Sequence, residues 1–196
     1  MKNVLVIVAH PDDETIWMGG MILRHSDWNW TVVSLCRKND LDRAPKFKKV
    51  CESYGVRGII GNLDDVQLHP LSEEEVKEKI ISLVPDEKYD IIYTHGENGE
   101  YGHLRHKEIH KAVKSLIREK SLLCKKGLCF SYVLGKETVP RIPELHIPKP
   151  KKEKRFVILN NEEYAKKTGL IKELYGFSSD SFETLSCNRM EAFKEI

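Results

Sequence analysis

Two clusters of proton-binding and metal-binding side chains stand out in the sequence. The first is the stretch HPDDE at 10–14, which directly follows an apolar run. The second lies in the segment 95–110, where His103, His106 and His110 are spaced three and four residues apart. Imidazole and carboxylate groups suit zinc and other first-row divalent ions, and a catalytic zinc site keeps one position for water. Together, the two clusters predict a metal site that could activate water.

The acids of the first cluster fit a metal better than a phosphate. Nucleotide-binding loops place glycines directly after the first strand, whereas Gly19 and Gly20 come too late for this role. Asp12 and Asp13 are adjacent and should point in different directions, so that one can bind a metal while the other acts as a base. Acids in the first turn of a helix also cap free amides and offset the helix dipole, which is the structural alternative. The histidines favour the metal, because their spacing puts them on one side of a helix, but the spacing leaves open which of them face the ion.

The elements that must position these clusters alternate between strand and helix. Continuous β-branched and apolar runs predict buried strands, and apolar residues at helical spacing predict helices. The predicted strands are 4–9, 30–36, 57–60, 89–95, 128–134 and 155–159, and the predicted helices are 15–25, 43–54, 72–84, 106–119 and 162–175. This alternation predicts an α/β fold with a Rossmann-like, doubly wound, mostly parallel sheet and helices on both faces. Both clusters follow strands, at the sheet edge where such folds bind ligands.

The composition is that of a globular protein with a mixed surface. The chain of 196 residues is 40% hydrophobic and 32% charged, and its 32 basic and 30 acidic residues leave a net charge of +2. We expect one domain over 1–196 and no nucleic-acid partner, because nucleic-acid binders usually carry a clearly basic face. The basic run at 149–155 is interpreted as a solvated loop.

Hydropathy and cysteine usage predict the compartment. No run reaches the roughly 18 apolar residues that span a membrane, and 2–9 is too short for a signal peptide. We therefore expect a cytoplasmic protein without a membrane span. The five cysteines are odd in number and form no Cys-x-x-Cys pair, which predicts buried reduced thiols rather than a disulfide framework or a zinc ribbon.

The motifs AHPDDE, from Ala9, and THGENGEYGHLRH, from Thr94, resemble those of the PIG-L/LmbE-like zinc-dependent N-deacetylases. Those enzymes act on N-acetylglucosaminyl groups and related amides, and the resemblance is strongest over 1–119. It implies that His10, Asp13 and His106 bind the metal, which would be Zn²⁺ with Fe²⁺ or Co²⁺ as alternatives.

The resemblance also implies roles for the remaining residues. Asp12 would be the general base, His103 the general acid or a transition-state stabiliser, and Tyr101 a donor to the oxyanion. His110 then becomes a helix-face residue, and Arg43 corresponds to a substrate-contacting arginine. The implied partner is a small N-acetylated sugar or glycoconjugate; its identity and any homo-oligomerisation stay open.

One departure from the family pattern keeps other functions open. The family commonly reads His-Pro-Asp-His where this chain has an arginine, Arg105, in place of the aspartate. We expect this arginine to favour the neutral form of His103. A metal-binding member without turnover is one alternative. A separate alternative, which rests on the acid pair after the first strand and not on Arg105, is a receiver-like signalling module using Asp64, Thr94 and Lys136, although receivers are shorter and do not need the histidines.

Overall fold

A mostly parallel sheet forms the centre of the computed structural model, which describes residues 1–140 and 142–196. Its seven strands run in the order β3-β2-β1-β4-β5-β9-β8. Strands β1 to β5 are parallel to one another. Strand β9 is antiparallel to β5, and β8 is antiparallel to β9. Their bounds are β1 Asn3–Val8, β2 Asn29–Cys36, β3 Arg57–Leu63, β4 Tyr89–Thr94, β5 Cys124–Phe130, β8 Arg155–Ile158 and β9 Met190–Glu195. A separate antiparallel hairpin pairs β6 Tyr132–Val139 with β7 Ile142–Pro150.

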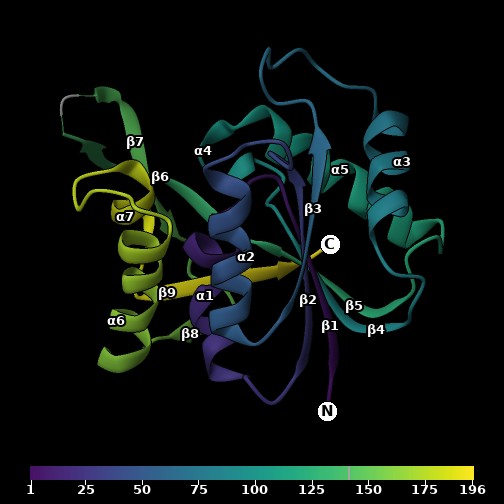
Figure 1. Cartoon of the computed structure of the whole chain (residues 1–196), viewed down its shortest axis with the longest axis horizontal. Coiled ribbons are helices and arrows are strands. Elements are labelled where there is room, and N and C mark those ends of the chain that lie inside the picture. The colour runs from purple at the N-terminus through teal and green to yellow at the C-terminus, as the bar shows by residue number, and fades with distance from the viewer. Residues whose placement is uncertain (141) are drawn as a thin grey trace.

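Helices cover both faces of this sheet (Figure 1). On one face lie α1, α2 and α6 with the π-helical turn η1, and on the other lie α3 and α5. The helices are α1 Asp13–Arg24, α2 Arg43–Tyr54, α3 Glu73–Leu83, α4 Gly99–Gly102, α5 Leu104–Arg118, α6 Asn161–Gly169, η1 Leu170–Leu174 and α7 Phe182–Ser186. The predicted Rossmann-like, doubly wound class is confirmed.

Strand β1 shows why the sheet needs two helical layers. Its side chains alternate between the faces: Val4, Val6 and Val8 belong to the core under α1 and α2, whereas Leu5 and Ile7 belong to the core under α3 and α5. All five are fully buried. A continuous apolar run is the sequence pattern of a strand with both faces covered.

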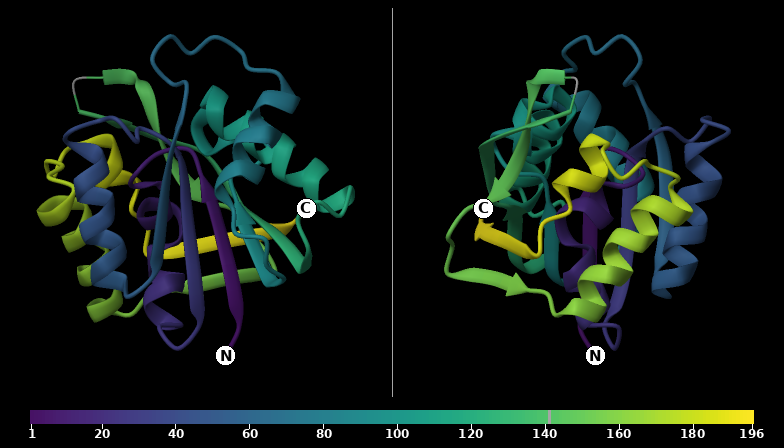
Figure 2. Two further views of the ribbon diagram at one scale, coloured as in Figure 1. Left: turned by 45° about the vertical axis from the view of Figure 1, so that its right-hand side comes forward. Right: turned by 90° about the vertical axis from the view of Figure 1, so that its left-hand side faces the viewer.

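The chain reverses its direction of growth across the sheet at β1. Strands β2 and β3 are added on one side of β1, and β4 and β5 on the other. Such a switch point leaves a crevice at the carboxyl ends of the two central strands. Both sequence clusters follow these strands, β1 and β4. In Figure 2 the β3–α3 loop and the β6–β7 hairpin rise beyond the same end of the sheet.

Two predictions of local structure were wrong. The predicted strand 128–134 is two strands: β5 ends at Phe130, the Ser131 N–H still donates to the Ala192 carbonyl of β9, and from Tyr132 the chain pairs with β7 in the separate hairpin. An apolar run in the sequence indicates buried strand residues, but it does not indicate to which sheet they belong. The basic run 149–155 is only partly a loop: its first two residues end β7, and Arg155 begins β8.

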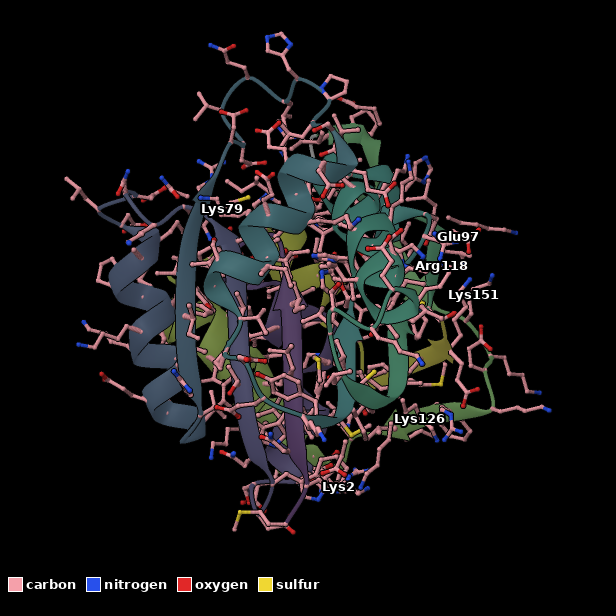
Figure 3. All side chains as sticks on the ribbon, turned by 90° about the vertical axis from the view of Figure 1, so that its right-hand side faces the viewer. Lys2, Lys79, Glu97, Arg118, Lys126 and Lys151 are labelled. Atoms are coloured by element: carbon pink, nitrogen blue, oxygen red, sulfur yellow. The ribbon has the colours of Figure 1, made fainter. Side chains whose placement is uncertain are left out.

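The surface and the thiols agree with the composition. Figure 3 shows the face made by α3 and α5, where side chains of both signs such as Glu97 and Arg118 point outward. The five cysteines are free thiols, four buried and Cys124 half-buried, as predicted. Within the part of the chain that the structure describes, no helix is both long enough and apolar enough to cross a membrane.

Candidate active site

The loop after β1 holds its two aspartates in different environments. Helix α1 begins at Asp13, and the residue before it, Asp12, has a φ of 125°, which non-glycine residues rarely adopt. Such a conformation costs about 1–3 kcal/mol, and it persists only when neighbours hold it. Here the Asp12 N–H donates to the Glu14 carboxylate at 3.1 Å. The Asp13 carboxylate accepts from the Trp17 indole at 2.9 Å and from the His10 N–H at 2.8 Å.

Three donor atoms from the two clusters converge on one point. His10 Nδ1 lies 3.2 Å from Asp13 Oδ2, and His106 Nε2 lies 3.3 Å from the first atom and 3.4 Å from the second. A tetrahedral ion with bonds of about 2.0–2.1 Å separates its ligands by about 3.3–3.4 Å. The three atoms therefore fit three corners of a zinc-like coordination sphere. The structure thus brings together the three residues that the family resemblance named.

Each imidazole of this triad has a carboxylate on its other nitrogen. His106 Nδ1 lies 2.6 Å from the fully buried carboxylate of Glu100, and His10 Nε2 lies 3.1 Å from Asp65 Oδ1. Carboxylates in this position fix the tautomer of a ligand histidine and turn its free nitrogen toward the metal. Neither Glu100 nor Asp65 was predicted from the sequence to take part in the site. Glu100 lies between two glycines of an irregular loop, where its own φ is 57° and that of Gly99 is 67°.

Two other histidines stand behind the triad. His95 Nε2 accepts the Ala9 N–H at 2.9 Å, and its Nδ1 lies 2.9 Å from Glu100. Both ring nitrogens are therefore engaged, although Nε2 is also 3.4 Å from Asp13. His110 bonds through Nδ1 to the His95 carbonyl at 2.8 Å and does not join the donor atoms. Of the three histidines that spacing could not separate, His106 is the one in the triad.

The charges around the triad favour a bound cation. Burial alone would lower the pKa of His10, but its contacts with Asp13 and Asp65 raise it to about 9. The pKa of Asp65 is lowered to about 2, because His10 and Arg37 outweigh the cost of burial. That of Glu100 is also lowered to about 2, against burial, by the neighbouring imidazoles. This acid-rich pocket holds positive charge on His10, and a divalent ion suits the same field.

Asp12 has a cation of its own. Arg43 donates through Nη1 to Asp12 Oδ2 at 2.7 Å, and its guanidinium lies 4.2 Å above the centre of the Phe177 ring. Burial and the neighbouring Asp13 raise the pKa of Asp12, and Arg43 opposes them. Arg43, which was expected to contact the substrate, thus bonds to Asp12, the expected general base.

A cavity of about 390 Å³ opens beside the triad. Tyr101, Trp17 and Phe182 supply aromatic lining, and Glu183 adds a carboxylate. The Tyr101 and Phe182 rings pack edge to face with centres 4.6 Å apart. The C-terminal third, which the sequence motifs did not cover, therefore contributes part of the wall through α7.

His103 lines the cavity next to His10, with ring centres 4.8 Å apart. Its Nδ1 is buried and has no hydrogen-bond partner among the described residues. Burial is the largest of the effects that lower the pKa of His103 to about 3, so the ring is neutral. The neutral form was expected. Besides burial, His106 and His10 lower this pKa, whereas the Arg105 guanidinium bonds to Asp64 and Glu108.

Comparison with solved structures supports the fold. N,N′-diacetylchitobiose deacetylase from Pyrococcus horikoshii superposes with a TM-score of 0.70 at 17% identity, covering 100% of this chain and 84% of that chain. GalB, the 4-carboxy-2-hydroxymuconate hydratase of Pseudomonas putida, superposes with a TM-score of 0.59 at 13% identity, covering 95% and 83%. One of these proteins is a hydratase and the other a deacetylase, so the fold alone does not decide the chemistry.

Sequence comparison gives the family. An uncharacterized protein of Acanthamoeba polyphaga mimivirus is 24% identical over 126 residues, which are 55% of this chain. The chain spans about half the length of that curated relative, 54%. The family model described as PIG-L, GlcNAc-PI de-N-acetylase, matches residues 5–117, a range that includes both site loops. The chain belongs to the PIG-L family of GlcNAc-PI de-N-acetylases.

Proposed function

We propose that this protein is a metal-dependent N-deacetylase that hydrolyses the acetamide of an N-acetylated amino sugar or a related amide. The observation that carries the proposal is the triad of His10, Asp13 and His106, with donor atoms 3.2–3.4 Å apart. Asp12, whose carboxylate is not one of the three donors, lies beside the triad and lines the adjoining cavity. Membership of a de-N-acetylase family and the similarity to a diacetylchitobiose deacetylase support the reaction class.

The triad would hold the ion, and Asp12 would handle the proton. A bound divalent metal lowers the pKa of its water to about 7 and polarises a carbonyl oxygen. Asp12 must be ionised to accept a proton from the attacking water. Its burial opposes ionisation, and the ion pair with Arg43 favours it. Arg43 therefore acts on the base in this proposal, besides lining the cavity that would receive the substrate.

Tyr101 and His103 would stabilise the negative charge that develops on the acetyl oxygen. Both side chains line the cavity. With its pKa lowered to about 3, His103 is neutral and offers an N–H donor rather than an acidic proton. Of its two family roles, we favour the stabiliser, and Asp12 then returns its proton to the leaving amine. Donors of this kind are each worth about 3–4 kcal/mol when removed.

The receiver-like alternative is not favoured. Its phosphorylatable residue would be Asp64, but that side chain bonds to the buried Arg105 guanidinium at 3.2 Å. The family match also covers the histidines that such a module does not need. A family member that binds metal without turnover is the alternative that an activity measurement must address.

Acetate release tests the proposal. Protein loaded with Zn²⁺, Fe²⁺ or Co²⁺ would be incubated with a panel of N-acetylated sugars, from N-acetylglucosamine to N,N′-diacetylchitobiose and N-acetylglucosaminyl-inositol. We expect stoichiometric acetate and free amine with at least one substrate, loss of activity on chelation, and recovery when the metal is restored. Metal binding at one equivalent without acetate from any substrate would instead support a member without turnover.

A further inference from the structure

We propose that Arg105 and Glu108 clamp the β3–α3 loop and thereby orient the triad residue His10. The inference rests on the proposed metal-binding function, and it assigns both residues as positioning residues. The clamp joins α5, which carries His106, to the loop 64–71, which carries Asp65. One helix would then supply one ligand directly and set the orientation of another.

Arg105 forms the first half of the clamp. Its side chain is fully buried, which is costly for a guanidinium unless its donors are paired. Nε donates to the Asp64 carbonyl, Nη2 lies 3.2 Å from the Asp64 carboxylate, and Nη1 lies 2.6 Å from Glu108. The planar fork thus holds the backbone and the side chain of one loop residue together. A lysine could not reproduce these contacts, because it is a single point charge.

Glu108 forms the second half. One carboxylate oxygen accepts from Arg105, and the other accepts the Leu71 N–H at 2.9 Å. The pair therefore fixes both ends of the loop to consecutive turns of α5. Between these ends the chain is exposed: Val66 is 84% exposed, and Leu68 is 44% exposed with a φ of 51°. In Figure 2 the loop projects beyond the sheet, so the contacts at its two ends are what keep it ordered.

Asp65 connects the clamped loop to the triad through its contact with His10. It directly follows the clamped Asp64 and is 8% exposed, and its Oδ1 lies within ion-pair distance of His10 Nε2, at 3.1 Å, although it has no hydrogen-bond partner of good geometry among the described residues. Its other oxygen is held by Arg37 at 2.6 Å. Carboxylates that contact a ligand histidine typically change metal affinity 10- to 100-fold when removed. A loop that drifts from α5 would move Asp65 and release the His10 ring.

Metal affinity tests the clamp without requiring turnover. Dissociation constants for Zn²⁺ and Co²⁺, and the absorption spectrum of the Co²⁺ form, would be measured for wild type, R105M, R105K, D65N and the double variant R105M/D65N. The control is K111M, which removes a 70% exposed cation from the same helix. We expect R105M to weaken binding about tenfold or more, R105K to recover only part of this, and K111M to leave affinity unchanged.

The double variant identifies the route. If Arg105 acts through Asp65, R105M/D65N should bind metal no more weakly than D65N alone, because the two substitutions break one path. Multiplicative effects, or an R105M variant that loses thermal stability but keeps wild-type affinity and spectrum, would overturn the clamp and leave the proposed function intact. Wild type that binds no metal would overturn both. If R105M does not fold, E108Q, which cannot satisfy both Arg105 and Leu71, makes the same comparison.

Discussion

At the scale of single residues, the site depends on neighbours with opposite tasks. Asp13 is tied to His10 and Trp17, whereas the adjacent Asp12 bonds to Arg43 across the cavity. The backbone conformation of Asp12, with its φ of 125°, is what separates the two carboxylates. Arg37 and Glu100 also have positive φ and also touch the site. Strained backbone conformations of this kind tend to cluster at functional sites.

Replacing Arg43 with methionine should shift the pH dependence of activity. Burial and Asp13 raise the pKa of Asp12 well above its usual range, and the guanidinium offsets part of this rise, so loss of Arg43 raises the pKa further and leaves less ionised base at a given pH. We expect the acid limb of kcat/KM to move to higher pH and the rate at pH 7 to fall by about tenfold or more. R57M, at an exposed arginine outside the site, is the control. An unchanged acid limb in R43M would separate Arg43 from the base.

Glu100→Gln should weaken metal binding rather than folding alone. A neutral amide cannot hold the His106 Nδ1 proton as the carboxylate does at 2.6 Å, so the ring loses its fixed tautomer. We expect the metal dissociation constant to rise about 10- to 100-fold, measured by competition with a chelator. The matched variant E97Q changes an exposed glutamate three residues earlier and should bind as wild type does. Equal affinities for the two variants would show that Glu100 does not act on the metal.

These residues also show how far the sequence predicts a site. The two clusters could be expected to meet because they follow neighbouring strands, but the choice of His10, Asp13 and His106 as ligands rested on the family resemblance. Asp65 and Glu100 could not be predicted, because their contacts with the histidines depend on the path of two irregular loops. Residue type alone does not reveal that path.

At the scale of elements, burial decides what can be predicted. Strands β1, β2 and β4 are buried on both faces and appear in the sequence as apolar runs. Strand β9 carries the fully buried Glu191 between half-buried Met190 and buried Ala192, and its sequence MEAFKE shows no clear strand pattern. Of the β6–β7 hairpin, only the start of β6 lay in a predicted strand, because most residues of the hairpin are exposed or half-buried.

The C-terminal elements are fixed to α1 by a buried ion pair. Lys167 of α6 lies 2.8 Å from Glu191 of β9, both side chains are fully buried, and Glu191 also accepts the Gly20 and Met21 N–H groups. Lys167→Met would leave the glutamate charge without its cation. We expect about 3–5 kcal/mol of lost unfolding free energy in denaturant titrations.

The exposed pair of Lys48 and Glu52 provides the control for this prediction. Its members lie 4.0 Å apart on α2, and the lysine is 80% exposed. Lys48→Met should change the unfolding free energy by no more than about 0.5 kcal/mol. Similar losses for K167M and K48M would show that the buried pair does not hold the C-terminal elements in place.

At the scale of the whole molecule, the central sheet has a hydrophobic core on each face, and the reactivity of the buried thiols tests how tightly the protein is packed. Burial raises the pKa of Cys129 and of Cys187 to about 12, so almost no thiolate exists at pH 8. Cys124 is half-buried. We expect iodoacetamide to label Cys124 first in the native protein, and all five cysteines after denaturation, as read by mass spectrometry. Equally fast labelling of Cys129 would mean that the core opens readily.

The measurement that tests the central claim most directly is acetate release by Asp12→Asn, loaded with Zn²⁺, on the best substrate of the panel. The account predicts that D12N still binds one equivalent of metal, because Asp12 is outside the triad. It should release acetate at least about 100-fold more slowly than wild type. The control D27N, at an exposed aspartate in the turn before β2, should match wild type. A metal-loaded D12N that turns over at the wild-type rate would contradict the account.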